Sequence, residues 1–353
     1  MSPGGQFVPD FGIRVNGAPL HAEIAADISG VEVVQEPNTL DHLRIRLWYE
    51  DPEHVQGSRT QDPLRVFAEG SAVELSLGYI DDLTKVFEGE VTGITAIFPG
   101  DTAPSLEVQC HSYMHRLRRS VRTKTYLKLK DSAIAAQVAR GAGMSIQAKV
   151  SKVTHDFVLQ YNQTDLEFLL ERASRIGFEL LADGKMLQFR EAGDAGTVAL
   201  KLSAADTLLS VTLREELLGQ GDSVTVRGVD MTGKAIVGKA AAGDVTPGAA
   251  RSGPKLSRKA FGATETLVVD RPLATKADAD AFALSILNGR ARAFVTGSGK
   301  SVGLPALRAG GVIELDGLGA KFNGKYYVVQ STHALAHDAG YTTSFRVRRN
   351  AVG

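Results

Sequence analysis

Two short clusters of cysteine and histidine are the residues in this chain that could bind a metal ion. Cys110 and His111 are followed by His115, and His333 is followed by His337 at the same spacing. Thiolate and imidazole groups at short spacing can share a zinc ion, but a structural zinc site needs four ligands. Neither cluster supplies four ligands by itself, and adjacent side chains at the end of a strand point to opposite faces. We therefore expect no metal site.

A pair of carboxylates could act as general acid and base, because Glu167 and Glu171 lie one turn apart on an expected helix. A structural interpretation is stronger. Thr164 and Glu167 have the spacing of a capping box, and Glu171 falls on the solvated face beside Arg175. The chain also lacks a complete phosphate-binding loop and the His-Glu-x-x-His pattern. We expect no enzymatic activity and no cofactor.

A run of positive charge lies between His111 and Lys130, where seven basic side chains occur without an acidic one. The first five are the candidate interface residues Arg116, Arg118, Arg119, Arg122 and Lys124. Such a run could bind nucleic acid, and a nucleic-acid-binding protein using residues 116–130 is one alternative function. The chain as a whole has 40 basic and 40 acidic residues, so no global field attracts nucleic acid. We favour a surface that pairs with acidic protein neighbours.

Length and composition indicate a folded protein of more than one domain. The chain has 353 residues, 43% of them hydrophobic and 23% charged, which is typical of soluble globular proteins. A single cysteine excludes an intrachain disulfide, and the first residues lack the pattern of a secretory signal. No apolar run is long enough for a membrane span. We expect cytoplasmic folding and no membrane partner.

Periodicity divides the chain into strand-rich ends and a mixed centre. Residues 1–120 alternate apolar and polar side chains between turn signals, which predicts antiparallel strands closing into a small barrel. Asp131 is the expected N-cap of one helix, and Thr164 begins a second that carries Phe168 on its apolar face. A hairpin follows over residues 178–190, so residues 121–200 form an α/β unit.

The last third combines a segment of small residues with a return to strands. Residues 231–264 are rich in Gly, Ala, Lys and Ser, which predicts an exposed, mobile loop. A helix capped by Thr275 is expected over residues 276–292, and strands resume after residue 303.

Two distant hairpins share one pattern. Val73-Glu74-Leu75 precedes Phe87-Glu88-Gly89, and Ile313-Glu314-Leu315 precedes Phe322-Asn323-Gly324. Turns need glycine, so similar hairpins can arise by coincidence. If the repetition is real, Phe87, Gly89, Phe322 and Gly324 fix equivalent hairpins in two related β-barrels.

The central helix and the closing strands resemble a known family. Tyr161-Asn162-Gln163-Thr164-Asp165, with Phe168 and Leu169, is similar to the Y-N-E-T-D-x-x-F-L-x-R motif of VgrG spike proteins and phage late control D proteins. Gln163 and Glu171 depart from that motif. Further similarity is found in Gly78-Tyr79, in Val86-Phe87-Glu88-Gly89 and in the run from Gly303 through Phe322-Asn323-Gly324 to Tyr341. The order of the matches agrees from front to back.

The resemblance implies a mainly β fold with α+β insertions, in which two antiparallel barrels and an α/β unit assemble as a trimeric ring with pseudo-sixfold symmetry. The implied domains are 1–120, a tube-facing first barrel; 121–200, the α/β unit; 201–230 with 302–353, a second barrel; and 231–301, a mobile Gly/Lys-rich loop and helix. VgrG proteins continue into an oligonucleotide-binding-type domain and a β-helical needle, whereas this sequence stops at Gly353. It therefore resembles the hub half of VgrG alone.

The resemblance also implies a structural function and its partners. We expect a homotrimeric baseplate hub that joins the hexameric inner tube to the trimeric spike of a contractile phage tail or injection system. Other baseplate proteins, with the tape measure as an option, are further expected partners, and nucleic acid is not expected. The protein would be cytoplasmic during assembly and then part of the baseplate or released particle. A wall-degrading enzyme module of the tail tip is the other alternative.

Overall fold

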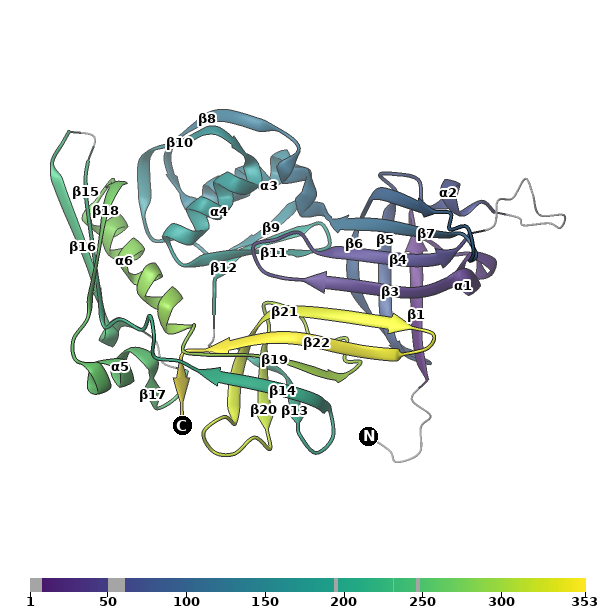
Figure 1. Ribbon diagram of the computed structural model, residues 1–353. Helices are drawn as coiled ribbons and strands as arrows, with labels where there is room; N and C mark the ends of the chain where they lie inside the picture. The colour runs from purple at the N-terminus through teal and green to yellow at the C-terminus, as the bar shows by residue number, and fades with distance from the viewer. Residues whose placement is uncertain (1–7, 50–60, 194–195, 231, 246–247) are drawn as a thin grey trace.

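The protein is mainly β, with one large sheet and four smaller sheets among the described residues (Figure 1). The structure is a computed structural model that describes residues 8–49, 61–193, 196–230, 232–245 and 248–353. Within these residues, no helix is both long and apolar enough to span a membrane.

A 13-stranded sheet connects the two ends of the chain, with the main order β14-β19-β22-β21-β3-β4-β7-β6-β5-β1-β2. Strands β13 and β20 pair beside this path. The strands are β1 (Pro9–Val15), β2 (Ala18–Pro19), β3 (Ile28–Gln35), β4 (His42–Trp48), β5 (Ala72–Tyr79), β6 (Asp82–Ile97), β7 (Ser105–Ser112), β13 (Val198–Ser203), β14 (Leu208–Glu215), β19 (Val295–Val302), β20 (Val312–Asp316), β21 (Gly324–Ala336) and β22 (Gly340–Arg349).

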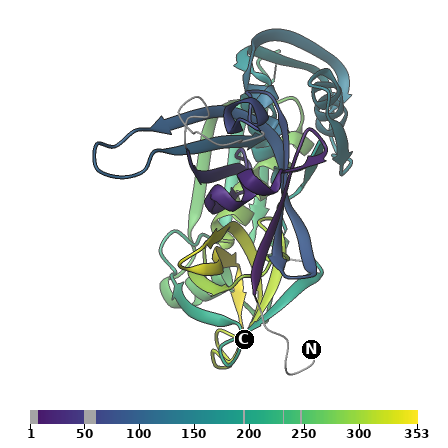
Figure 2. The same cartoon turned by 90° about the vertical axis from the view of Figure 1, so that its right-hand side faces the viewer.

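The pairing of β21 with β3 makes this one sheet. Ser331 lies opposite Gln35 and Ala336 opposite Gly30, so the strands are antiparallel over six residue pairs. Figures 1 and 2 show the yellow C-terminal strands beside the purple N-terminal strands. The sequence predicted strands at both ends of the chain, but gave no sign that they would hydrogen-bond to each other.

Alternation along the strands places apolar side chains on one face of the sheet. Val31, Val33, Leu43 and Ile45 are buried, whereas the residues between them are only partly buried. This is the pattern of a sheet that faces a core on one side and water on the other. One core lies under β1–β7, with the short helices α1 (Ala22–Asp27) and α2 (Pro63–Val66) beside it, and a second core lies under β13–β22.

A compact α/β unit occupies the middle of the chain. It contains η1 (Tyr113–Arg118), β8 (Val121–Lys130), α3 (Asp131–Gly141), β9 (Ser145–Ala148), β10 (Thr154–Thr164), α4 (Asp165–Arg175), β11 (Phe178–Asp183) and β12 (Met186–Glu191). β8 and β10 form a two-stranded ribbon, and β11-β12-β9 forms a small sheet. Helices α3 and α4 share a core with both sheets.

The predicted capping box at the start of α4 is confirmed. The Thr164 hydroxyl accepts a hydrogen bond from the Glu167 N–H at 3.2 Å, and the Glu167 carboxylate accepts from the Thr164 N–H at 2.8 Å. The two bonds satisfy donors that the first turn of a helix cannot satisfy by itself.

The predicted N-cap of α3 is wrong by one position. Lys130 is the N-cap, and Asp131 is the first helical residue. The Asp131 carboxylate faces inward, where it accepts a hydrogen bond from Arg172 Nε at 2.6 Å. A long-range charged partner, which local spacing cannot reveal, therefore decides the direction of this side chain.

Regular elements replace the loop predicted over residues 231–264, apart from residues 231 and 246–247, which lie outside the described chain. The elements of this region are β15 (Ser223–Val229), β16 (Ala235–Ala241), η2 (Ala242–Asp244), β17 (Arg251–Ser252), α5 (Gly253–Phe261), β18 (Glu265–Pro272) and α6 (Lys276–Ala291). Thr275 caps α6 as predicted, with its hydroxyl 3.1 Å from the Asp278 N–H.

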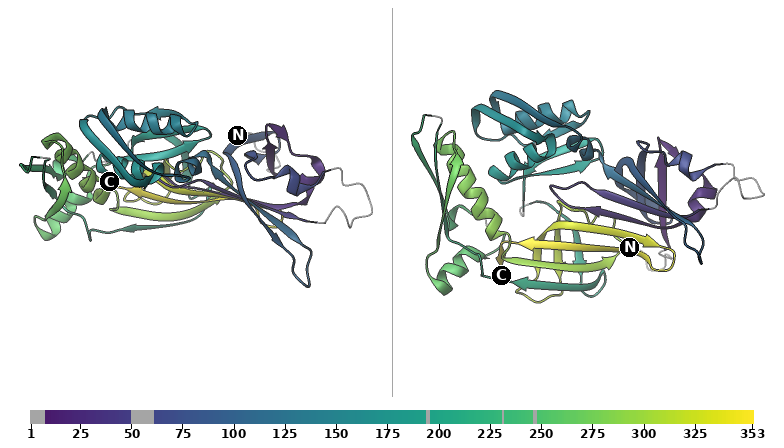
Figure 3. Two further views of the ribbon diagram at one scale, coloured as in Figure 1. Left: turned by 90° about the horizontal axis from the view of Figure 1, so that it is seen from above. Right: turned by 45° about the horizontal axis from the view of Figure 1, so that its top comes forward.

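The loop prediction was wrong because the small residues of this region allow a helix and a sheet to pack closely. β16, β15 and β18 form a sheet on which α6 lies directly (Figure 3). A Cβ at Gly238 would overlap the Ala279 backbone, so only glycine fits at that crossing. The short β17 pairs with β23 (Ala351–Val352), which ties this region to the C-terminal strands.

Replacing Phe168 by alanine should destabilise the α/β unit. Phe168 is 1% exposed and stacks on Tyr126 with ring centroids 5.4 Å apart. The truncation should lower the free energy of unfolding by about 3–5 kcal/mol, because it removes packed aromatic surface and leaves a cavity. Urea unfolding measures the change, with Leu127→Ala as the control, since Leu127 is 63% exposed on the neighbouring ribbon. Equal stability of both variants would contradict this placement of Phe168.

Candidate assembly interface

Several edges of the large sheet are open in the described chain, among them β13 and the first residues of β1, and two of them bound the run of strands from β14 to β6. β14 pairs only with β19. β6 pairs with β5 as far as Glu90, and beyond Val91 it pairs with β7 alone as far as Ile97. We call residues 92–97 the β6 edge and residues 208–213 the β14 edge. Each presents a row of backbone N–H and C=O groups without a neighbouring strand.

Both edges lack most of the features that normally prevent pairing, although the register shifts near the start of each, at residues 91–93 and 208–210. Proteins protect open strands with lysine, proline, inward charges or covering segments. The β6 edge reads Thr-Gly-Ile-Thr-Ala-Ile and the β14 edge reads Leu-Leu-Ser-Val-Thr-Leu, so both lack charge and proline. Each also exposes an apolar side chain, with Ile97 46% and Leu209 57% exposed. Such edges are ready positions for another strand.

The basic run from residue 116 is partly used inside the chain. Arg116 Nε donates to Glu90 at 2.9 Å, and His115 Nε2 lies 2.7 Å from the same carboxylate. Burial by itself would raise the pKa of Glu90, but the hydrogen bonds from Arg116 and His115 outweigh it and lower the pKa. The Arg116 guanidinium therefore holds η1 against β6.

The remaining predicted interface residues differ in whether their side chains contact other groups of the same chain. Arg122 Nε lies 3.4 Å from Asp165 Oδ2, and the Lys124 ammonium lies 4.9 Å from the centre of the Tyr126 ring. Arg118 and Arg119 are exposed and form no ion pair within the described residues. An interface role for the run stays a prediction, and these two arginines are the cations most available for it.

The motif residues around α4 are held by local contacts. Asp165 accepts a hydrogen bond from Gln160 Nε2 at 2.9 Å, and Asn162 has a left-handed backbone with φ of 49°. Tyr161 is 69% exposed on β10. These placements show how the turn into α4 is built, while its equivalence to the VgrG motif stays a prediction.

The two departures from the motif contact each other. Gln163 Nε2 donates to Glu171 Oε2 at 3.0 Å. The expected neighbour of Glu171, Arg175, points elsewhere, since its Nη2 lies 3.1 Å from Asp278 Oδ2 of α6. That buried pair joins two helices 103 residues apart in sequence, which helical spacing cannot predict.

The two similar hairpins both form, but in different registers. In the first, Leu75 lies opposite Phe87, which is buried, and a Cβ at Gly89 would overlap the His111 carbonyl. In the second, Leu315 lies opposite Gly324, whose φ is 125°. Phe322 therefore falls in the turn rather than in a strand, where its carbonyl accepts a hydrogen bond from the Tyr326 hydroxyl at 2.7 Å. Tyr341 lies elsewhere, buried on β22 with its hydroxyl 2.9 Å from His333 Nδ1.

A buried charged cluster inside the α/β unit was missed by the sequence analysis. His155 Nε2 lies 3.0 Å from Asp131 Oδ2 and 2.9 Å from Arg172 Nη2. Burial by itself would raise the pKa of Asp131, but the hydrogen bonds and charge of His155 and Arg172 hold that pKa below its usual value. The cluster fixes α3, β10 and α4 relative to one another.

Two further buried carboxyl groups lie where the α/β unit meets the large sheet. Glu179 of β11 accepts a hydrogen bond from the Tyr327 hydroxyl at 2.6 Å, and burial raises the pKa of Glu179. Asp41, between β3 and β4, lies 3.4 Å from Gln35 Nε2. Burial raises the pKa of Asp41 to about 7, although the charge of Arg308 acts in the opposite direction.

The residues with reactive side chains are placed for structure. Cys110 is buried, which raises its pKa to about 12, and burial lowers the pKa of His333 to about 4. Among the described residues, no three His, Cys, Asp or Glu side chains group as a metal site.

One catalytic-looking pattern was overlooked in the sequence. Gly299-Lys300-Ser301-Val302-Gly303 has the Gly-x-Ser-x-Gly spacing of a nucleophile elbow, which requires a turn from strand to helix. Ser301 instead lies inside β19, fully buried, and its hydroxyl donates to the Thr343 carbonyl at 3.2 Å. Its position is that of a core serine.

Comparison with known proteins identifies a family. The profile described as the Alg8 N-terminal domain matches residues 6–337. The chain belongs to this family. The description names a domain and states no activity or partner, and a search of curated proteins found no significant match.

Solved structures with the same fold include phage tail proteins. The 43 kDa tail protein of prophage MuSo2 from Shewanella oneidensis has a TM-score of 0.71 and 11% identity, with 97% of this chain and 98% of that chain covered. A tail protein from Neisseria meningitidis MC58 has a TM-score of 0.70 and 10% identity, with 97% of each chain covered. At these identities the likeness establishes the fold alone.

A protein of a secretion machine has a related fold. This component of the E. coli type VI secretion system, itself described as similar in structure to T4 bacteriophage tail proteins gp27 and gp5, has a TM-score of 0.60 and 15% identity. The match covers 96% of this chain and 77% of that one. The β-rich fold of this chain is therefore also found in phage tail proteins and in a component of a type VI secretion system.

Replacing Asp41 by asparagine should remove a pH dependence of stability. Because the folded pKa of Asp41 is about 7, the folded state holds more protons than the unfolded state between about pH 4 and pH 7. Its contribution is therefore complete below about pH 4 and decreases as the pH rises to 7, by up to about 1.4 kcal/mol per pH unit. Urea unfolding from pH 4 to 8 should show this decrease in the original protein but not in D41N. Asp82→Asn, an exposed control, should keep the original profile, and an unchanged profile in D41N would contradict the assignment.

Proposed function

We propose that this chain is a structural hub subunit of the baseplate, joining the hexameric inner tube to the trimeric spike of a contractile phage tail or related injection system. The fold shared with tail proteins and with a type VI secretion component supports a structural role. The α4 motif and the closing strands support the hub among tail proteins. The observation that carries the proposal is the pair of open, uncharged edges that bound the run of strands from β14 to β6.

The open edges support assembly into a ring. From β14 to the β6 edge, the sheet runs through eight strands. If the β14 edge of one copy pairs with the β6 edge of the next, the contact is heterologous and repeats around an axis until the ring closes. Closure at three copies is the expectation from the family resemblance. Each copy would then contribute two β regions, giving the sixfold outline that a hexameric tube requires.

Pairing of the edges would continue both faces of the sheet. Thr95 lies opposite Glu107, and Ser210 lies opposite Lys300, so both side chains belong to the polar rows of their strands. Strands joined in this alignment keep polar side chains on one face and apolar side chains on the other. Backbone hydrogen bonds between the paired strands would hold the ring together, and no chemical reaction would be needed.

The remaining parts of the chain have proposed roles in this ring. Segment 1–120 and segments 201–230 with 302–353 would supply the two related barrels, and 121–200 would be the outer α/β unit. Segment 231–301 would pack beside the second barrel. The exposed cations Arg118 and Arg119 would contact acidic groups of a neighbouring copy or another baseplate protein.

Cysteine cross-linking between differently labelled copies tests the ring. Thr95→Cys and Ser210→Cys each add an exposed thiol, whereas the natural Cys110 is buried and remains protonated because its pKa is about 12. A short bismaleimide should produce covalent dimers when the T95C and S210C chains are mixed, and not with either chain alone. Ser344→Cys, on a central strand of the same sheet, is the control and should form no dimer with T95C.

The mass of the particle tests whether a trimeric ring forms, independently of whether the two strand edges pair. Light scattering should give about three times the chain mass of 37.6 kDa, with a ring in negative-stain images. A trimer without the mixed cross-link would reject the edge pairing and keep the hub. A monomer that ignores tube and spike proteins would reject the hub itself.

A further inference from the structure

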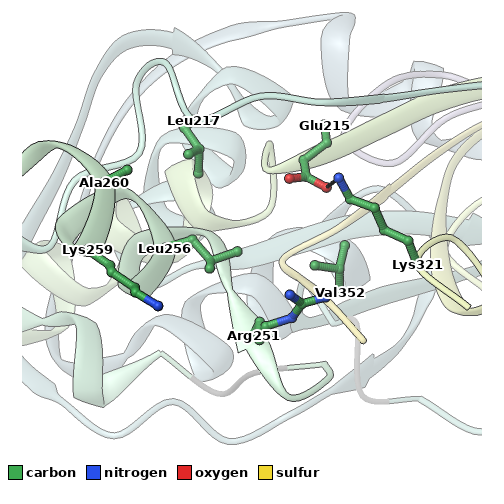
Figure 4. A pocket seen from close by; sticks show the side chains of 8 residues that line it. All are labelled: Glu215, Leu217, Arg251, Leu256, Lys259, Ala260, Lys321 and Val352. Carbon is green, nitrogen blue, oxygen red and sulfur yellow. Dashed lines mark ion pairs between the residues drawn. The ribbon is translucent and has the colours of Figure 1, made fainter.

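A pocket of about 330 Å³ lies between the end of β14, helix α5 and the short C-terminal strand β23 (Figure 4). Leu217, Leu256 and Val352 form its apolar part. Val352 is 1% exposed and belongs to the second core, against which Leu217 and Leu256 pack. The pocket therefore has a firm apolar base that is continuous with the interior.

The pocket carries an excess of positive charge. Of its four charged side chains, Lys321 and Glu215 neutralise each other, with Lys321 Nζ 2.9 Å from Glu215 Oε2. Arg251 of β17 and Lys259 of α5 form no ion pair within the described chain, and both are exposed. Figure 4 shows these two side chains on the same side of the pocket, reaching it from different elements. A bound anion would meet two cations without an ion pair among the described residues, and one of them, Arg251, also lies beside Gly353.

Exposed apolar side chains lie next to the pocket in sequence. Leu218 follows the lining residue Leu217 and is 85% exposed, and Phe261 follows Ala260 and is 75% exposed. These are the largest exposed fractions among the large apolar side chains of the described residues. Each of these side chains is next in sequence to a lining residue, and their exposure to water is unfavourable, so a ligand that extends beyond the pocket could cover them.

We propose that this pocket binds an acidic segment of a partner polypeptide, in which one Glu or Asp side chain is flanked by apolar residues. The carboxylate would lie between Arg251 and Lys259, where charge-assisted hydrogen bonds are strong. The flanking side chains would cover Leu256, Leu218 and Phe261. A phosphate or a nucleic acid backbone would satisfy the cations but leave this apolar surface exposed, so its chemistry fits less well.

The pocket also gives a role to a second group of basic residues, which lies in and just before α5. Arg251, Lys255, Arg258 and Lys259 lie close together in the chain, but the fold separates their tasks. Arg258 Nη1 lies 3.3 Å from Asp222 Oδ2, and Lys255 does not line the pocket. Only Arg251 and Lys259 of this group reach it. The site uses neither open edge of the large sheet, so it does not depend on the ring.

A matched pair of peptides tests the pocket on the full-length protein. The probe is a fluorescein-labelled, C-terminally amidated peptide of sequence Gly-Leu-Leu-Glu-Leu-Leu-Gly, and its control has Gln in place of Glu. Fluorescence anisotropy should show the Glu peptide binding at least about tenfold more tightly, because a hydrogen-bonded charge contributes more than a neutral amide.

Charge reversal on α5 locates the binding. Lys259→Glu should weaken binding of the Glu peptide at least about tenfold, whereas Lys152→Glu, the same charge change at an exposed lysine outside the pocket, should change it less than about twofold. Both lysines are exposed, so both variants should fold, as circular dichroism verifies. Equal losses in the two variants would show nonspecific attraction and overturn the proposal.

The remaining outcomes also decide the matter. Equal affinity for the Glu and Gln peptides would mean that no carboxylate is recognised. If the Gln peptide binds tightly only with a free C-terminal carboxylate, the pocket accepts a chain terminus and the proposed side-chain ligand is wrong. A failure of ring assembly with intact peptide binding would leave this site in place and count only against the ring.

Discussion

The antiparallel pairing of β21 with β3 is the constraint on which the rest of the molecule depends. It connects segments about three hundred residues apart and turns two groups of strands into one sheet. Leu335 and Tyr341, from the C-terminal strands, complete the core under the N-terminal strands. A slip of one residue in this pairing would turn each buried side chain toward water, so the two cores fix the register.

Buried polar contacts orient the smaller units on this sheet. Arg175 of α4 pairs with Asp278 of α6, and Glu179 of β11 bonds to Tyr327 of β21. Burying such groups costs desolvation energy, so each contact stabilises only when its partner is in place. This favours one arrangement of the units over others with similar apolar packing. The same principle holds α3 and α4 together through Asp131, Arg172 and His155.

The surface has two kinds of candidate binding region, which differ in how they would select a partner. The open edges at β6 and β14 offer backbone groups that any compatible strand can use, which suits a copy of the same chain. The pocket beside α5 offers two cations on an apolar base, which selects a ligand by charge and shape. A likeness of 10–15% identity to tail proteins retains the fold, while it leaves such surface features free to differ.

Local signals were sufficient for part of this structure. The capping box of Thr164 and Glu167, the Thr275 cap and the alternating strands follow from contacts within a few residues, so the sequence predicted them. The secondary structure of residues 231–264 was not predictable in that way, because Gly238 and its small neighbours form a helix-packing surface that resembles a loop in composition.

Only the tertiary structure decided the partners of the charged residues. Arg116 binds Glu90, Asp131 binds Arg172, and Arg175 binds Asp278, each across a long stretch of chain. The pocket of Arg251 and Lys259 likewise requires β14, α5 and β23 to meet. Outside residues 231–264, the sequence by itself determined most of the segments that form strands and helices, because that depends on local periodicity. Which of them became neighbours depended on a shared core, and no local pattern records that choice.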